Sequence, residues 1–372
     1  MRYHFKTNYD QDIRLFEDRR DMVLYGLLAL VAFCGPFYLD DYLLGEFTYV
    51  LIFTLAGLGL MVLVGHTGQV SLGHGAFLAC GAYLQYNFID AGLPFLIAFP
   101  LAGLFSGFIG AIVAIPALRM SGIYLAIATL AFGIIVEDVI ILLEHWTGGI
   151  EGVFIPGITF LGIDFDRYAQ SISFAASGHN FYWLCLVVVI GVTLLYKNLL
   201  RSPTGRAFTA IRDSEVSARA MGINVSLYKS IAFGVSCCFT GLAGALLAHF
   251  LGAFNYEAFL ILISIQLLLM VTIGGLGSIH GAYIGALVVG LLPVVITIIR
   301  EEISSFMGLG NVTIPGLDYA VFASLLIVII IIEPLGIYGR WLKVRTWFEL
   351  FPLARKDMFK RHKSYLKTER MK

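Results

Sequence analysis

Apolar residues occupy most of this chain in long runs, separated by short polar stretches. An α-helix rises about 1.5 Å per residue, so about 20 apolar residues cross the ~30 Å hydrocarbon core of a bilayer. Runs of this length therefore predict membrane-spanning helices. We expect about ten of them, at residues 22–39, 44–64, 76–90, 94–116, 121–143, 181–200, 227–251, 258–274, 281–299 and 317–337.

The longest polar interruption in the second half of the chain covers residues 201–226. Ser202-Pro203-Thr204-Gly205 predicts a turn that ends the preceding helix. No residue from Arg206 to Met221 breaks a helix, and Gly222 follows where a C-terminal capping glycine is expected. The pattern predicts one short amphipathic helix between two membrane spans. We expect this helix to lie in a groove on another protein; a solvated surface helix is the alternative.

A glycine-rich stretch, Gly65 to Ala82, opens the third apolar run. Glycine-rich backbone at this depth is tolerated where protein covers it or where it lines a wet cavity, and small residues let helices approach closely. A second such stretch runs from Gly274 to Gly290, and its His280-Gly281-Ala282-Tyr283 is similar to His74-Gly75-Ala76-Phe77. The similarity indicates a weak internal repeat of a duplicated transporter half, with chance similarity as the alternative.

Composition excludes a soluble globular protein: 59% of the residues are hydrophobic, 13% are charged and the mean hydropathy is +0.85. Basic residues accumulate on cytoplasmic loops. With the N-terminus inside and ten spans, all of the 25 Lys and Arg residues except Arg167 and Arg300 fall inside or at an inner helix end. We therefore expect a cytoplasmic N-terminal arm at 1–21, a transmembrane domain at 22–337 with its polar loop 201–226 inside, and a basic cytoplasmic tail at 338–372.

Catalytic motifs are missing from the sequence, which contains no Walker sequence, HExxH or CxxC pair. We therefore expect no enzyme and no cofactor in this chain. His66 and His74 have no carboxylate or cysteine nearby and are read as polar packing or interfacial residues rather than metal ligands. In the tail, Trp341 and Trp347 alternate with basic residues, as suits a segment on anionic lipid headgroups and not one that binds nucleic acid.

The middles of the predicted spans contain no Asp, Glu, Lys, Arg or His. Proton-coupled carriers usually place a carboxylate or histidine relay inside the bundle, because the proton needs a binding site. If the protein pumps, we expect its energy to come from outside the membrane domain, through the loop at 201–226.

Two motifs carry a resemblance to a known family. The stretch Asp213-Ser-Glu-Val-Ser-Ala-Arg-Ala-Met-Gly-Ile-Asn224 resembles the EAA-type loop of ABC-importer permeases, and its longer context from Ser202 to Ser236 resembles the LivM type of branched-chain amino-acid permease. The GxxGxxSLGH run from Gly65 to His74 is similar to one in LivM and LivH permeases. The resemblance covers about Leu44 to Ile337.

The resemblance implies an all-α integral membrane protein with about ten transmembrane helices and a cytoplasmic coupling helix that docks on an ATPase. The protein would be a bacterial inner-membrane permease subunit paired with a second, LivH-like permease, two cytoplasmic ATPases that bind ATP and Mg, and an extracytoplasmic binding protein. The expected ATPase-coupling residues are Arg212, Glu215, Ala218, Arg219 and Gly222. The residues expected to shape the translocation path by close helix packing are Gly68, Ser71, Gly75, Gly274, Gly277 and Gly281.

The expected substrate is a branched-chain or related amino acid. Urea and short-amide importers share this permease family, so they are the first alternative. An ATPase-independent secondary carrier or channel is the alternative of a different class; it would transport in proteoliposomes without any ATPase.

Overall fold

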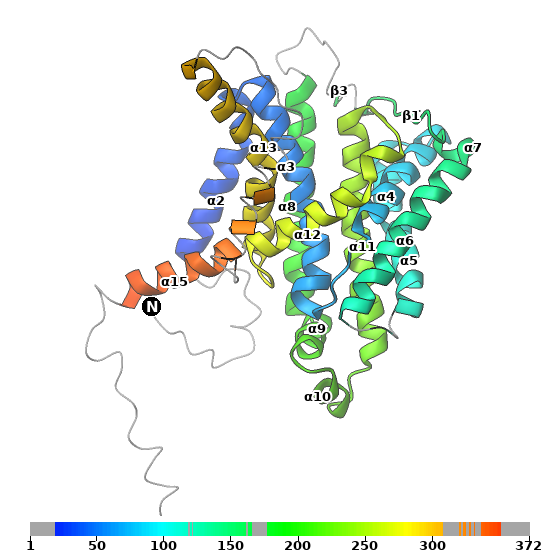
Figure 1. Ribbon diagram of the computed structural model, residues 1–372, viewed down its shortest axis with the longest axis vertical. Coiled ribbons are helices and arrows are strands. Elements are labelled where there is room, and N and C mark those ends of the chain that lie inside the picture. Colours follow the sequence, from blue (N-terminus) through cyan, green and yellow to red (C-terminus); the bar gives the residue numbers. More distant parts are fainter. Residues whose placement is uncertain are drawn as a thin grey trace, which may run out of the picture.

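The computed structural model describes residues 19–117, 120, 122–160, 163–165, 177–307, 320, 323–324, 327–328, 331 and 336–350. These residues are mostly helical (Figure 1). The helices are α2 (Arg19–Phe33), η1 (Gly35–Phe37), α3 (Asp41–Leu60), η2 (Met61–Gly65), α4 (His74–Asp90), α5 (Phe95–Ala117), α6 (Ile123–Leu142), α7 (Glu144–Thr147), α8 (Ser177–Arg201), α9 (Pro203–Asp213), α10 (Glu215–Ala220), α11 (Val225–Leu251), η3 (Tyr256–Phe259), α12 (Ile261–Gly274), α13 (Ile279–Met307) and α15 (Gly336–Leu350).

Seven helical stretches in the described residues are long and apolar enough to cross a membrane. They are 41–65, 95–116, 123–142, 179–201, 225–251, 256–274 and 279–298, and each coincides with one of the ten predicted spans. The structure therefore supports seven of the ten predicted membrane spans. The predicted span 317–337 lies mostly outside the described residues.

The two remaining predicted spans, 22–39 and 76–90, correspond to helices of 15 and 17 residues. The helix α2 ends at Phe33, because Gly35 and Pro36 form a single 3₁₀ turn there, and Pro36 has no N–H to continue the α-helix. The helix α4 begins at His74, two residues before the predicted run, and has 17 residues, or about 26 Å at the α-helical rise. Hydropathy located both apolar runs but did not detect the turn that ends α2.

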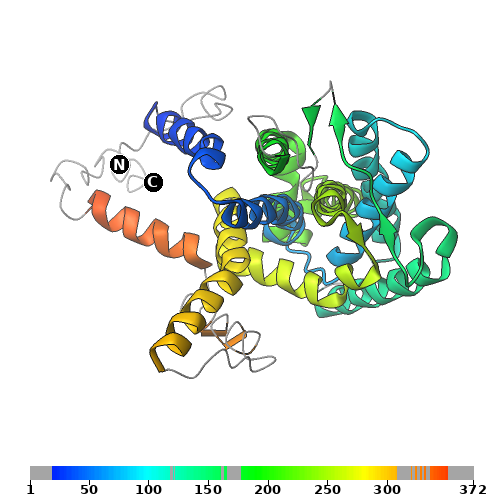
Figure 2. The same cartoon turned by 90° about the horizontal axis from the view of Figure 1, so that it is seen from above.

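Two helices form the centre of the bundle. In the 18-residue apolar part of the stretch 41–65, which is α3 with the π-helical turn η2, 83% of the residues are buried, and in that of α11 72% are buried. In the other five long helices the corresponding share is 28–39%, so their outer faces carry exposed apolar side chains such as Leu104, Phe108 and Ile127. Figure 2 shows α4, α5 and α6 on one flank of this centre, and α2, α13 and α15 on the other.

The two ends of the bundle differ. The polar helices α9 and α10 project from one end, and α7 and the short strands lie at the opposite end (Figure 1). There β1 (Val153–Phe154) pairs antiparallel with β4 (Ala253–Phe254), which ties the segment after α7 to the end of α11. A second pair joins β2 (Thr159–Phe160) and β3 (Ile163–Asp164). The described residues are mostly helical, as expected, and the four strands have two residues each.

The predicted arm at 1–21 lies almost entirely outside the described residues. The predicted basic tail is described over its first part, where α15 forms a helix that leaves Trp341 and Trp347 more than half exposed. This helix begins beside the second glycine-rich stretch, since Tyr338 stacks on His280 with the ring centroids 4.8 Å apart.

Candidate functional site

The polar loop folds as two helices, α9 and α10, and the prediction of one uninterrupted helix was wrong. Ser214 has an extended backbone (φ −165°, ψ 113°), which breaks the helix after Asp213. The Ser214 hydroxyl accepts a hydrogen bond from the Ser217 N–H at 3.2 Å and so caps the start of α10. A serine followed by an acidic residue is an N-terminal helix signal, so the sequence did contain the sign of this break. We call residues 202–222 the docking segment.

The beginning of the docking segment is also capped. The Ser202 hydroxyl accepts from the Gly205 N–H at 3.3 Å, and Pro203 occupies the first helical position. The predicted turn at 202–205 is thus the first turn of α9.

Gly222 closes the segment in the left-handed conformation, with φ +83°. The Ile223 N–H donates to the Ala218 carbonyl and the Gly222 N–H to the Arg219 carbonyl, both at 3.0 Å. These two bonds form a Schellman cap, in which glycine is favoured because it has no Cβ to clash.

The apolar side chains of the docking segment divide into two sets. Ala207, Phe208 and Ile211 are buried against the bundle, and Ala218 packs with Ile211 and Val225. Val216 and Met221 are 79% and 83% exposed. Ala218, predicted as an ATPase-coupling residue, therefore fastens the segment to its own chain, and the exposed apolar surface lies at Val216 and Met221.

Glu215 has two basic neighbours. Its Oε2 lies 3.8 Å from Nη2 of Arg219, the pair that the four-residue spacing suggested. Its Oε1 lies 2.5 Å from Nζ of Lys229, whose side chain is 9% exposed. The Lys229 contact joins α10 to the central helix α11. Sequence reasoning missed it because Lys229 lies at the start of an apolar run and was read as part of a membrane span.

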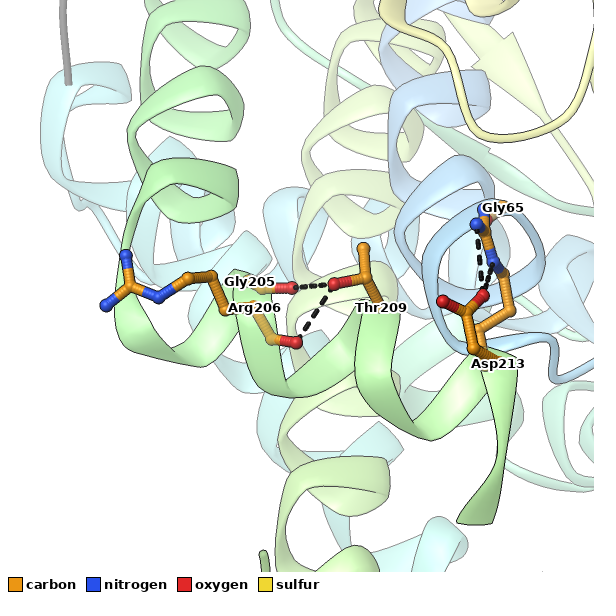
Figure 3. A network of polar contacts seen from close by, with 6 residues as sticks. Gly65, Gly205, Arg206, Thr209 and Asp213 are labelled. Atoms are coloured by element: carbon orange, nitrogen blue, oxygen red, sulfur yellow. Dashed lines mark hydrogen bonds and ion pairs between the residues drawn. The ribbon is translucent and has the colours of Figure 1, made fainter. Parts of the chain in front are cut away.

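Arg212 reaches from the docking segment into the first glycine-rich stretch. Its Nη1 donates to the Gly65 carbonyl at 2.9 Å, and its Nη2 lies 3.4 Å from Oδ1 of Asp213. Figure 3 shows Gly65 close to Asp213 at the end of α9. The same view shows Thr209 bound to the carbonyls of Gly205 and Arg206 within that helix.

The first glycine-rich stretch leaves the helix at Gly65 and resumes it at His74. Between them the chain is mostly buried by protein, with Ser71 fully buried and Gly68 exposed in a left-handed turn (φ +70°). Of the two surroundings that such backbone tolerates, the structure favours protein. A small cavity lies beside it, lined by Leu72, Ala76, Gly133, Glu137, Phe259 and Ser264, among others.

Three of the predicted small residues leave no room for a Cβ: Gly75 faces side chains, and Gly274 and Gly281 face backbone carbonyls. A Cβ on Gly75 would meet Cγ2 of Ile263 and Oγ of Ser264, both at 2.7 Å, and the Gly75 N–H already donates to that hydroxyl. A Cβ on Gly274 would overlap the Gly281 carbonyl, and one on Gly281 would overlap the Gly275 carbonyl. Gly277 has φ +80° and lies beside Arg212.

A buried polar chain connects the first glycine-rich stretch to the central helices. Nε2 of His74 lies 2.8 Å from Oγ of Ser236, and Ser236 donates to the Gly59 carbonyl at 2.6 Å. Because the Ser236 proton is used there, Nε2 of His74 is the donor, and Nδ1 is left to accept from Ser71 at 2.9 Å. One neutral tautomer satisfies the ring, which agrees with the reading of His74 as polar packing.

Among the described residues, no group of three or more His, Cys, Asp or Glu side chains is placed so that it could hold a metal ion.

Several long apolar helices around a buried helical centre define a multi-pass membrane protein. Residues 42–332 match the family described as "Branched-chain amino acid transport system / permease component", and the chain belongs to that family.

Similar proteins include the "High-affinity branched-chain amino acid transport system permease protein LivM" of Salmonella typhimurium, 35% identical over 269 residues, and that of Escherichia coli, 34% identical over 278 residues. The alignments cover 68% and 70% of this chain but 63% and 64% of those proteins, so the chain spans less than two thirds of their length. The LivH permease protein of Escherichia coli is 26% identical over 303 residues, 77% of this chain and 91% of that protein. No solved structure matches the chain.

Proposed function

We propose that this chain is a permease subunit of an ATP-driven ABC importer for branched-chain or related amino acids. The observation that carries the proposal is the docking segment. It is capped at both ends, fastened to the bundle by Lys229 and Arg212, and leaves Val216 and Met221 exposed on a polar projection. Family membership and the printed names of the relatives give the substrate class.

In this proposal the docking segment is cytoplasmic and binds one of two ATPase subunits, which hold ATP and Mg. The chain itself carries no cofactor and performs no catalysis. Its other partners are a LivH-like second permease, an extracytoplasmic binding protein and the lipids of the bacterial inner membrane. The complete chain has about ten spans with both termini cytoplasmic. Gly68, Ser71, Gly75, Gly274, Gly277 and Gly281 shape the translocation path.

Reconstitution tests this function. Proteoliposomes with the chain, its second permease, both ATPases and the binding protein are expected to take up radiolabelled leucine with enclosed ATP on the ATPase side, and not with a non-hydrolysable analogue. Uptake of labelled urea in place of leucine would reassign the substrate to the urea and short-amide class. Uptake by the permeases alone, without ATPase or ATP, would reject the importer in favour of a carrier or channel.

The orientation gives a separate prediction. Single cysteines at Glu151, beyond α7, and at Ser217, on α10, are both at exposed positions at opposite ends of the bundle. In a variant without the five native cysteines, a membrane-impermeant maleimide added to intact cells is expected to label E151C, and S217C only after the membrane is opened. Labelling of S217C in intact cells would invert the topology and remove the docking segment from the cytoplasm.

A further inference from the structure

Three separate parts of the chain meet at Arg212. The docking segment supplies the guanidinium, the end of η2 supplies the Gly65 carbonyl 2.9 Å away, and the second glycine-rich stretch passes alongside. A Cβ on Gly277 would lie 3.0 Å from Nη1 of Arg212, and one on Gly68 would lie 3.4 Å from its Cγ. Both glycines have positive φ, a conformation that other residues adopt only with strain.

The two glycine-rich stretches also touch each other at this point. A Cβ on Gly65 would lie 2.8 Å from the backbone nitrogen of Gly277, and the Gly277 N–H lies 3.2 Å from Sδ of Met61. We call this meeting of residues 61–68 and 274–277 the glycine junction. Arg212 therefore lies next to both sides of the junction.

The chemistry of the contact makes it stronger than a neutral hydrogen bond. The carbonyl at the end of a helix has no partner within the helix, and a cation there also interacts favourably with the helix dipole. The π-helical turn Met61–Gly65 is wider than an α-helical turn, and such turns occur frequently at functional sites. The guanidinium of Arg212 binds the buried Gly65, while 42% of the Arg212 side chain remains exposed.

We propose that Arg212 is the positioning residue that transmits movement of the docking segment to the glycine junction. This inference rests on the proposed function, because it requires an ATPase bound to that segment. Arg212 then acts toward its own membrane domain and not chiefly toward the ATPase. Lys229 holds the docking segment to α11, and Arg212 links it to the junction between the two glycine-rich stretches.

The test compares Arg212→Gln and Arg212→Lys with Arg206→Gln in the assembled complex. Arg206 lies on the same helix, and its Nη1 binds the nearby Arg201 carbonyl at 3.2 Å rather than the glycine junction. The readouts are ATPase pull-down and hydrogen exchange of residues 65–73, 274–279 and 203–222, with and without ATP and orthovanadate, which traps the ATPases with ADP and vanadate after hydrolysis. Exchange in α11 reports whether each variant is folded.

In the wild type, trapping is expected to change exchange in all three peptides. Arg212→Gln is expected to keep the ATPases and the change in 203–222, and to reduce the change in 65–73 and 274–279 about tenfold, the effect of one lost charge-assisted hydrogen bond. Arg212→Lys keeps a donor and is expected to retain most of the change, and Arg206→Gln all of it.

Two results would overturn the inference while leaving the function intact. Unchanged exchange at the junction in Arg212→Gln would show that the contact transmits nothing. Loss of ATPase binding in Arg212→Gln in proportion to the loss at the junction would make Arg212 a docking residue. If the wild-type chain does not bind the ATPases, the proposed function fails and the inference fails with it.

Discussion

Substitution of Gly281 by leucine is expected to prevent stable assembly of the membrane domain. The new Cβ would overlap the carbonyl of Gly275, a backbone atom that cannot rotate away as a side chain can. Overpacking a core costs roughly 1–3 kcal/mol even when neighbours relax, and relaxation here requires the turn between α12 and α13 to move. Gly274→Leu is expected to behave in the same way, because its Cβ would overlap the Gly281 carbonyl.

The measurement is thermal unfolding in detergent, followed by size-exclusion chromatography, together with uptake in vesicles. Gly191→Leu is the matched control: it lies in α8, where a Cβ has nothing within 4 Å, and leucine is a better helix former than glycine by nearly 1 kcal/mol. We expect its melting temperature to equal or exceed that of the wild type. Equal tolerance of leucine at 191, 274 and 281 would show that the two helices are not packed at backbone distance.

Substitution of Glu215 by alanine is expected to release the second helix of the docking segment. It leaves the ammonium of Lys229, 9% exposed, without the carboxylate 2.5 Å away, and an unsatisfied buried polar group costs about 1–3 kcal/mol. The expected result is faster hydrogen exchange and protease cleavage in residues 214–222, with weaker retention of the ATPase subunits. The exchange of α11 beyond its first turns is expected to stay unchanged.

Two further variants identify which partner of Glu215 matters. Arg219→Ala removes a 3.8 Å contact that Arg219 makes to Glu215, and the Arg219 side chain is itself 67% exposed, so we expect an effect within about 0.5 kcal/mol. The exchange of charges in Glu215→Lys with Lys229→Glu keeps a pair of opposite sign and is expected to recover part of the protection. A larger effect of Arg219→Ala than of Glu215→Ala would reverse the assignment.

Much of the fold could be predicted from apolar runs alone, since seven of them form helices long enough to cross a membrane. The apolar runs could not predict which helices lie at the centre of the bundle. The stretch 41–65 and α6 have similar mean hydropathies, 2.3 and 2.4. Yet 83% of the residues in the apolar part of 41–65 are buried, against 28% in that of α6. Hydropathy measures the preference for leaving water, and lipid and protein satisfy it equally.

In the candidate site, too, the sequence predicted local features but not the contacts between distant segments. The capping glycine at 222 was predictable because its conformation is a local property of the chain. The contacts of Arg212 with Gly65 and of Lys229 with Glu215 join segments 147 and 14 residues apart, and no local pattern in one sequence specifies them. Local chemistry therefore located the docking segment, and only the packed structure identified what it is attached to.

The late position of α11 in the chain has a consequence for synthesis. Two buried polar side chains of α4 find partners there: His74 binds Ser236, 162 residues later, and Gln85 lies 3.2 Å from His249, 164 residues later. At about 5–20 residues per second, a ribosome needs roughly 8–32 s to make that length of chain. During this interval α4 has left the ribosome with a histidine and a glutamine that lipid cannot satisfy, so it must wait beside the insertion machinery or another polar surface until α11 arrives.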